Sequence, residues 1–312
     1  MGTILSSIKE NIDRVLIGQS RTVDLLLTSL LAGGHVLVED VPGTGKTVLA
    51  RSLAKSVSAD FGRVQFTPDL LPSDVTGLNF FDPQKAEFVF NPGPVFCNIL
   101  LADEINRATP RTQSSLLECM AEGQVTIDGV TRKLGSPFFV IATQNPVETL
   151  GTYPLPEAQL DRFLMRISME APTRAQEVAI LERFREEEPL EALQPVCTKE
   201  EIVALRQQVR KNYVNPALLD YMAALAQSSR SFRGVELGVS PRGTLALLRA
   251  SQAYAFVQGR EFVTPEDVKA VAVPVLAHRL SVSGGINSVK AQQQAVQELM
   301  ESVPVPTEEW GK

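Results

Sequence analysis

The segment from Val38 to Ala50, VEDVPGTGKTVLA, combines residue types that could bind the phosphates of a nucleotide. Gly43 and Gly45 tolerate the unusual dihedral angles that turn consecutive backbone N–H groups toward an anion. Lys46 would add a positive charge, and Thr47 would offer a hydroxyl group to a metal ion. A Gly-x-Gly-Lys-Ser/Thr pattern arises by chance in such a chain with odds on the order of one in a hundred. We therefore interpret the segment as a phosphate-binding loop.

The surroundings of this loop match what phosphate binding requires. Residues His35 to Glu39 have the apolar pattern of a buried strand, and residues Val48 to Val57 have that of an amphipathic helix. Asp40 stands where such a loop usually has its first glycine, but it precedes the glycines that form the turn. We expect it to alter the approach of the strand and to leave the cradle intact. The predicted nucleotide-binding residues here are Pro42, Gly43, Thr44, Gly45, Lys46, Thr47 and Val48.

Two further apolar runs end in polar residues. NILLADE ends in Asp103, which would order the water shell of Mg²⁺ together with Thr47, and in Glu104, which would activate the attacking water. FFVIATQN ends in Asn145, at the place where open α/β sheets put ligand-binding groups. The acidic pair alone is a weak signal, and Asn145 could simply form a turn before Pro146. The phosphate loop upstream favours a catalytic pair and a residue that orients water or senses the γ-phosphate.

The chain changes character at about Met169. Before it, short β-rich runs alternate with helical patterns, which is typical of strands and crossover helices in a mostly parallel sheet. After it, only helical patterns follow, several of them opening on Thr or Pro. We predict an α/β nucleotide-binding core at residues 1–170 and a smaller all-helical lid with a C-terminal tail at residues 171–312. In the tail, Gly284 and Gly285 indicate a loop before a last helix.

Composition limits the other possibilities. The 312 residues are 44% hydrophobic, which is enough for a large core, and no apolar run approaches the ~20 residues of a membrane span. We expect a soluble, cytoplasmic protein without a membrane span. The net charge of -6 argues against a broad surface for duplex nucleic acid. Three separated cysteines and two histidines support neither a disulfide framework nor a structural zinc site.

Taken in this order, the motifs resemble those of AAA+ ATPases. PGTGKT resembles the Walker A motif, ILLADE resembles Walker B, and Asn145 matches sensor 1. Three segments resemble the MoxR family in particular: EDVPGTGKT, ADEINRATPRTQSSLLECMAEGQVTIDG and YPLPEAQLDRFLMRI. The resemblance runs from about Ile17 to His278, and Asp40 is usual for this family. It implies a AAA+ P-loop core, with a mostly parallel sheet and flanking helices, followed by the helical lid.

Two arginines gain roles only from this resemblance. Arg162, in LDRF, matches the arginine finger that is presented to the γ-phosphate of a neighbouring subunit. The alternative for Arg162 is a surface salt bridge with Asp161 or Glu157. Arg242, in SPRG at the start of a lid helix, matches sensor 2, which reaches the nucleotide of its own subunit. The alternative for Arg242 is a solvent-exposed position, although a helix N-terminus is an unfavourable place for a cation.

The resemblance also extends to the binding of the base. Ile17 and Gly18, in VLIGQ, match the segment along which adenine lies, although Gly18 could merely start a turn. The implied ligands are therefore ATP or ADP with Mg²⁺.

Two insertions fit the same family. Residues 69–91 have the pattern of a hairpin with exposed aromatic residues, and residues 123–137 have that of a second hairpin with Asp128-Gly129 at its turn. AAA+ proteins of this branch are thought to contact client proteins with such hairpins at the pore of a ring. The alternative is ordinary solvent-exposed β structure.

The function that this resemblance implies is Mg-dependent ATP hydrolysis by a ring oligomer, with six subunits as the expected number. Such a ring would act as a chaperone-like remodelling or assembly factor for client proteins, with a von Willebrand factor A domain protein as a possible partner. The alternatives are a nucleic-acid-associated AAA+ motor, which the acidic charge disfavours, and a nucleotide-binding switch without turnover. Glu104, Asn145 and Arg162 are all present, so the sequence does not predict an inactive site.

Overall fold

The core of the protein is a five-stranded parallel sheet with the strand order β2-β5-β8-β1-β9. The structure is a computed structural model that describes residues 2–39, 43–145, 151–186, 188–283, 289–307 and 310. A helix lies in each connection between consecutive strands of this sheet, as parallel pairing requires. The strands are β1 (Val36–Glu39), β2 (Phe61–Gln65), β5 (Ile99–Asp103), β8 (Phe139–Gln144) and β9 (Met165–Ile167).

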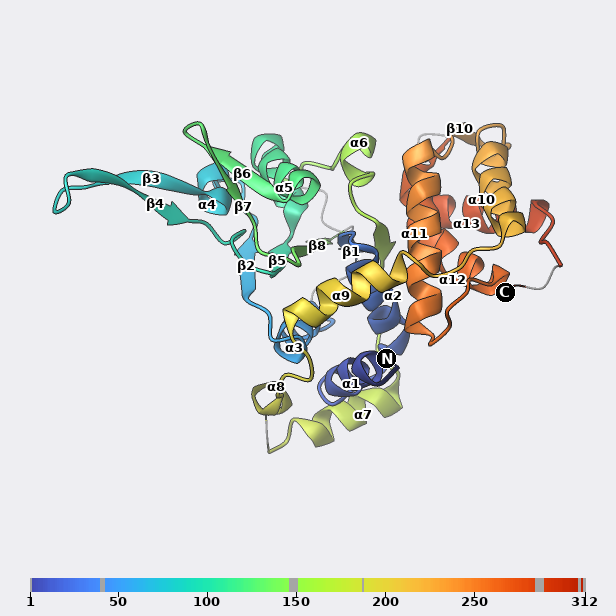
Figure 1. Ribbon diagram of the computed structural model, residues 1–312, viewed down its shortest axis with the longest axis horizontal. Helices are drawn as coiled ribbons and strands as arrows, with labels where there is room; N and C mark the ends of the chain where they lie inside the picture. Colours follow the sequence, from blue (N-terminus) through green and yellow to red (C-terminus); the bar gives the residue numbers. More distant parts are fainter. Residues whose placement is uncertain are drawn as a thin grey trace.

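Different helices cover the two faces of this sheet (Figure 1). Successive residues of a strand point to opposite faces, so Leu101 and Ile141 pack with α1, α2 and α3, whereas Leu100 and Val140 pack with α5. The predicted crossover architecture is confirmed. These helices are α1 (Gly2–Asp13), α2 (Ser20–Ala32), α3 (Lys46–Ser56) and α5 (Pro110–Glu122), and the short η1 (Ile105–Arg107) and α6 (Glu157–Leu160) complete the core.

A buried histidine just before β1 links this strand by hydrogen bonds to β8 and α5. The ring Nδ1 of His35 accepts a hydrogen bond from the N–H of Val140, 3.0 Å away, and its Nε2 donates to the carbonyl of Met120, also 3.0 Å away. Burial lowers the pKa of His35 to about 4. Both bonds require the neutral ring protonated on Nε2, because a backbone N–H can donate only to an unprotonated nitrogen.

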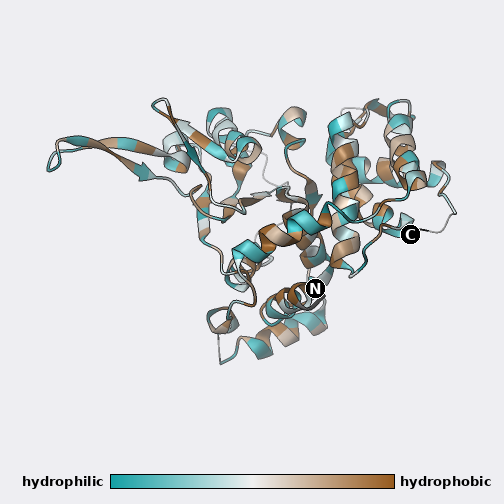
Figure 2. Ribbon diagram, viewed as in Figure 1, coloured by the Kyte–Doolittle hydropathy of each residue, from teal (hydrophilic) through white to brown (hydrophobic). Residues whose placement is uncertain are grey.

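Both predicted hairpins are present. The segment 69–91 begins with the short helix α4 (Pro72–Thr76) and continues as β3 (Gly77–Asp82) and β4 (Glu87–Pro92), which project away from the core (Figure 1). The colours of Figure 2 show hydrophobic residues along this projecting ribbon. Phe80, Phe81 and Phe88 are 45%, 51% and 74% exposed. The second hairpin pairs β6 (Gln124–Ile127) with β7 (Val130–Lys133), and Asp128-Gly129 forms its turn.

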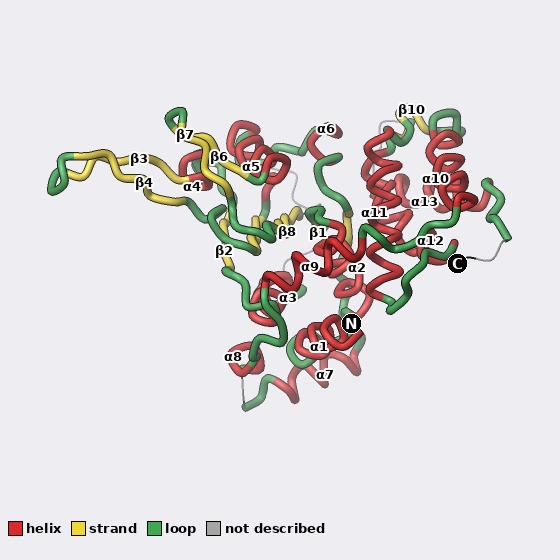
Figure 3. Tube along the Cα trace, viewed as in Figure 1, coloured by secondary structure: helices red, strands yellow, loops and turns green. Residues whose placement is uncertain are grey.

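Helices dominate the chain after β9 (Figure 3). Several begin with a side-chain cap: the Thr198, Asn215 and Ser240 oxygens accept hydrogen bonds from backbone N–H groups of the first turn. The helical lid is confirmed, and the expected last helix forms as α13. The helices are α7 (Arg174–Arg183), α8 (Pro189–Ala192), α9 (Lys199–Val209), α10 (Pro216–Ser229), α11 (Pro241–Val257), α12 (Pro265–Leu276), η2 (Ala277–Arg279) and α13 (Val289–Ser302).

The lid also contains two short strands that the sequence patterns did not reveal. β10 (Val235–Leu237) pairs antiparallel with β11 (Ser281–Val282). The predicted boundary between residues 170 and 171 falls in the connection between β9 and α7 and remains a prediction. Gly284 and Gly285 lie outside the described residues. None of the helices in the described ranges is long and apolar enough to cross a membrane.

Candidate active site

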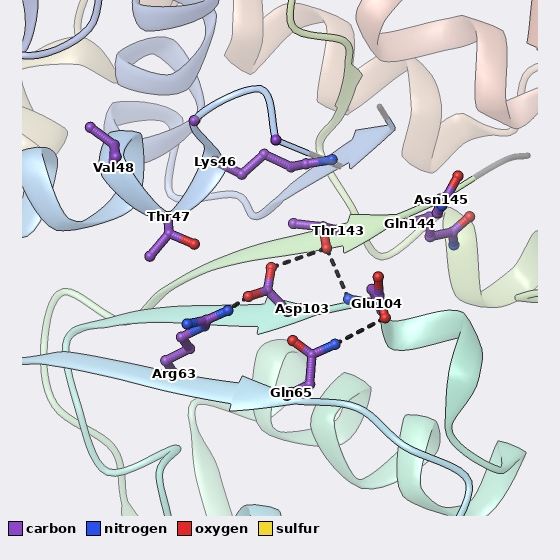
Figure 4. Close-up of a pocket in the computed structure, with 12 residues that line it drawn as sticks. Lys46, Thr47, Val48, Arg63, Gln65, Asp103, Glu104, Thr143, Gln144 and Asn145 are labelled. Carbon is purple, nitrogen blue, oxygen red and sulfur yellow. Dashed lines mark hydrogen bonds and ion pairs between the residues drawn. The ribbon is translucent and has the colours of Figure 1, made fainter. Parts of the chain in front are cut away.

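A cavity of about 380 Å³, which we call the strand-end cavity, opens at the carboxyl ends of β5 and β8, beside the N-terminus of α3 (Figure 4). This is the edge at which open parallel α/β sheets bind ligands. The predicted loop residues from Gly45 to Val48 meet the ends of three neighbouring strands there. The residues that line the cavity are Gly43, Gly45, Lys46, Thr47, Val48, Arg63, Gln65, Asp103, Glu104, Thr143, Gln144 and Asn145.

The glycines of the loop have the backbone conformation that the phosphate-loop interpretation requires. The φ angles of Gly43 and Gly45 are +89° and +93°, in the left-handed region that L side chains rarely adopt. A Cβ atom on Gly45 would also lie 2.9 Å from the Leu16 Cδ1 atom. Gly45 caps α3 without a side-chain hydrogen bond, so the first turn of α3 offers backbone N–H groups and the positive end of its dipole to an anion.

Not every predicted loop residue contributes to the cavity. Thr44 lies between the two glycines and is not part of the lining. Asp40 and Pro42 lie outside the described residues.

The carboxylate of Asp103 is held between two groups. Its Oδ2 lies 2.8 Å from Nε of Arg63, and its Oδ1 accepts a hydrogen bond of 3.3 Å from the Thr143 hydroxyl (Figure 4). Asp103 is only 8% exposed, so a desolvated negative charge faces the cavity with a guanidinium as its counter-charge.

Glu104 follows Asp103 in a strained conformation. Its φ angle is +56°, a left-handed value that is uncommon for a residue other than glycine. Its N–H donates a 2.9 Å hydrogen bond to the Thr143 hydroxyl oxygen. The carboxylate Oε2 lies 2.9 Å from Arg107 Nε and accepts a 3.0 Å hydrogen bond from Gln65 Nε2. The turn after β5 thus directs Glu104 into the cavity next to Asp103, and two polar partners hold it there.

Sequence reasoning missed Arg63, Gln65 and Thr143. The available signal was alternation: in RVQF, Arg63 and Gln65 fall on one face of a strand, and in FFVIATQN, Thr143 follows Ile141 on the same face. What could not be read was the lateral order of the strands, which puts β2 and β8 on either side of β5. Asn145, which was predicted, is 7% exposed and lines the cavity just after β8.

The donor groups fit a small divalent cation. Mg²⁺ prefers oxygen ligands and retains several waters, and the carboxylate of Asp103 and the hydroxyl of Thr47 both line this cavity. The guanidinium of Arg63 shows in addition that a cation finds a favourable position beside Asp103.

The side chain of Arg162 lies elsewhere. Its Nη1 donates a 2.8 Å hydrogen bond to the carbonyl of Leu117 in α5. Arg162 lines a second cavity of about 340 Å³ together with Glu118, Glu122 and Gln159. The structure therefore does not bring Arg162 into the cavity formed by the phosphate loop of the same chain.

Arg242 also stands outside the strand-end cavity. It lies at the start of α11, its side chain is 58% exposed, and its Nε is 3.7 Å from Oδ2 of Asp161. The other carboxylate oxygen of Asp161 lies 2.7 Å from Nε of Arg279, a buried residue of the lid. Burial lowers the pKa of Arg279, and Asp161 opposes this shift. Arg279 also donates hydrogen bonds to the carbonyls of Phe163, at 2.7 Å, and Leu164, at 3.2 Å.

Ile17 and Gly18 are not among the residues that line the strand-end cavity. Gly18 has a φ angle of +77°, and a Cβ atom there would lie 2.3 Å from Nε2 of Gln176 in α7. The segment is therefore a turn covered by the first helix after the core. Its role in binding a base stays a prediction.

Comparison with known proteins extends these observations. The family described as ATPase family associated with various cellular activities (AAA) matches residues 35–165, and the AAA lid domain family matches residues 227–302. The protein YeaC of Bacillus subtilis is 48% identical over 98% of this chain and 96% of its own length. Chaperone MoxR1 of Mycobacterium tuberculosis is 42% identical over 86% of this chain and 73% of its own length. The crystal structure of a proposed ATPase from Cytophaga hutchinsonii superimposes with a TM-score of 0.90 at 36% identity, covering 98% of this chain and 96% of that chain.

The matches to the AAA core and lid, on a fold that brings a phosphate loop and an acidic strand end to one cavity, define a AAA+ protein. The similarity to MoxR1 is more specific, because it covers most of both chains. The chain belongs to the MoxR family of AAA+ ATPases.

Proposed function

We propose that the protein binds ATP with Mg²⁺ at the strand-end cavity and hydrolyses it to ADP and phosphate. The observation that carries the proposal is the convergence of Lys46, at the N-terminus of α3, and the carboxylates of Asp103 and Glu104 on one cavity. Cation and N–H groups on one side and carboxylates on the other are what phosphate binding and water activation require.

The proposed role of each residue in the cavity follows from its position there. Lys46 and the N–H groups of the α3 N-terminus would hold the phosphates, and Thr47 and Asp103 would hold Mg²⁺, which supplies charge neutralisation between the phosphates. Glu104 would orient the attacking water and accept its proton, with Asn145 holding the water or the γ-phosphate in line. Gln65 and Arg107 hold the Glu104 carboxylate, so Glu104 would have to turn away from both before it contacts the water.

The assembly that supports this reaction is, in our proposal, a ring of subunits, with a hexamer as the expected form. Arg162 lies outside the cavity of its own chain, on a surface that includes α5. A neighbouring subunit is the partner to which such a cation would supply transition-state charge. Arg242 would act within its own chain, after its exposed side chain turns away from Asp161.

The mechanical output that we propose is remodelling or assembly of client proteins. Support comes from the relative named chaperone MoxR1 and from the β3–β4 hairpin, which exposes Phe80, Phe81 and Phe88 to solvent. Exposed aromatic side chains are the residues that protein interfaces favour. A von Willebrand factor A domain protein is the proposed partner, and the cytoplasm is the proposed location.

The decisive test separates binding from turnover. Glu104→Gln removes the proposed base, so the ATPase rate should fall by roughly 10²–10⁴-fold. The affinity for Mg-ATP, measured with a fluorescent ATP analogue, should stay within about twofold, because Glu104 is not assigned to phosphate binding. Glu182→Gln, an exposed change in α7, serves as the matched control and should retain the parental rate. Hydrolysis at the parental rate by the Glu104→Gln protein would disprove the assignment.

A further inference from the structure

Asp103 already has a cation beside it, supplied by the neighbouring strand. β2 pairs with β5 in parallel, with Arg63 opposite Leu101 and Gln65 opposite Asp103. Arg63 and Asp103 are therefore diagonal neighbours on one face of the sheet, within reach of a long side chain. The same alternation puts the side chains of Arg63, Asp103 and Thr143 on the side of the sheet that carries α3 and the phosphate loop.

The two members of this pair differ in their exposure to solvent. The side chain of Asp103 is 11% exposed, whereas that of Arg63 is 50% exposed. The guanidinium can therefore be hydrated when it leaves the carboxylate. The cost of the separation falls on the buried Asp103, unless another cation replaces the lost counter-charge. The carboxylate cannot leave, because it sits at the end of the buried strand β5 and accepts a hydrogen bond from the Thr143 hydroxyl.

A metal ion near Asp103 would meet this pair directly. Oδ2 of Asp103 contacts Arg63 and Oδ1 contacts Thr143, so the oxygen nearer to Arg63 is shared with a positive charge before any metal arrives. A guanidinium and a divalent cation at the same carboxylate oxygen repel each other. Binding of one therefore weakens binding of the other.

We propose that Arg63 is a tethered counter-cation that competes with Mg²⁺ for Asp103. The inference rests on the proposed function, because it assigns a metal to Asp103. Without nucleotide, Arg63 neutralises the buried carboxylate and holds it in the orientation seen here. When Mg²⁺ enters with the nucleotide, Arg63 moves off Asp103 into the cavity that Lys46 also lines. Arg63 thereby sets the Mg²⁺ concentration at which the site fills.

The test measures metal binding and does not depend on turnover. The full-length protein and its Arg63→Gln variant are mixed with a fluorescent ATP analogue, and Mg²⁺ is titrated from a chelated start. Competition predicts that the half-saturating Mg²⁺ concentration is roughly two- to fivefold lower in Arg63→Gln, as expected when a partly exposed ion pair is removed. Mn²⁺ binding followed by electron paramagnetic resonance should shift in the same direction.

Two further variants complete the experiment. Arg63→Lys keeps a cation near Asp103 and should return the half-saturating concentration to within about twofold of the parent. Lys199→Gln removes the 3.4 Å ion pair with Asp60, which lies just before β2 and outside the cavity. It should leave the Mg²⁺ titration unchanged. Thermal unfolding of each variant identifies any that fail to fold. If Arg63→Gln is one of them, Arg63→Met, which keeps the aliphatic length without the charge, takes its place with the same expected decrease in the half-saturating Mg²⁺ concentration.

The outcomes distinguish the two proposals. An unchanged or higher half-saturating Mg²⁺ concentration in Arg63→Gln, with normal Mg²⁺-dependent binding by the parent, would overturn the competition and make Arg63 a support for Asp103. If the parent protein shows no Mg²⁺-dependent nucleotide binding, the proposed function fails, and this inference fails with it.

Discussion

The strand-end cavity and the surface around Asp161 differ in how many of the predicted site residues a single chain brings together. In the cavity, one chain gathers the phosphate loop, Asp103, Glu104 and Asn145 from three elements of the sheet layer. Around Asp161, the two arginines that match catalytic roles bind other partners: Arg242 lies beside Asp161 itself, and Arg162 contacts the Leu117 carbonyl. In our proposal, the fold of one chain thus completes the half of the site that binds phosphate and metal. The cations for the transition state would then come from a reorientation of Arg242 or from another subunit.

The prediction with the largest expected effect tests this difference by mixing two inactive variants, Arg162→Ala and Glu104→Gln. Arg162→Ala subunits should bind ATP normally, yet they should hydrolyse it roughly 10³–10⁵-fold more slowly, because each site lacks the cation of its neighbour. In a mixture with Glu104→Gln subunits, some boundaries pair an intact Arg162 with an intact Glu104. ATPase activity should return at a fraction of the parental rate, provided that size-exclusion chromatography shows mixed assemblies.

Arg185→Ala is the control for this experiment, since it removes an exposed arginine that pairs with its neighbour Glu186 at 2.7 Å. Its activity should equal that of the parent. A robustly active Arg162→Ala protein without any partner would end the proposal that Arg162 acts across a boundary.

A second prediction tests the proposed phosphate-binding half of the site. Lys46→Ala removes the fixed cation of the cavity, so Mg-ATP affinity should fall by roughly tenfold to a hundredfold, as expected for losing hydrogen bonds to a charged group. The measurement is equilibrium binding of a fluorescent ATP analogue. Lys55→Ala is the matched control on the same helix, where Lys55 pairs with Glu191 at 3.2 Å away from the cavity. Equal affinities for the parent and Lys46→Ala would contradict the phosphate-loop interpretation.

The prediction with the smallest expected effect concerns the pH dependence of stability, through a buried histidine of the sheet that supports the site. The pKa of His35 is about 4 in the folded protein and near 6.5 when unfolded, so the unfolded state binds a proton first as the pH falls. Stability is fully present above pH 6.5 and decreases toward pH 4, with a loss on the order of 2 kcal/mol between pH 7 and pH 5 from this residue.

Urea unfolding at both pH values measures this loss. His35→Gln, which still donates and accepts hydrogen bonds but does not titrate, should show a smaller decrease than the parent. His278 has a pKa lowered by burial in the same direction, so the comparison between parent and variant isolates His35. An identical pH dependence for both proteins would argue against a neutral, buried His35.

The sequence was sufficient to predict those site residues that lie in short contiguous motifs. The loop glycines, Lys46, Asp103 and Glu104 lie in contiguous motifs whose strand and helix settings can be read from short patterns. Arg63 was missed because its role depends on which strand lies beside β5, a contact between residues far apart in the chain. The β10–β11 pair was missed because strands of three and two residues are too short to show an alternating pattern. The resemblance to a family suggested roles for Arg162 and Arg242, but their local partners could be known only from the structure.

The buried Arg279 makes a rigid coupling between the lid and the segment that carries Arg162. Its guanidinium binds the Asp161 carboxylate and the carbonyls of Phe163 and Leu164, the residues on either side of Arg162 and the next along the chain. Separating them would strand a buried charge without partners, a change that typically costs several kcal/mol. A rotation of the lid would therefore shift the Arg162 backbone together with Arg279. In the ring that we propose, such a shift in one subunit would reach the boundary with the next.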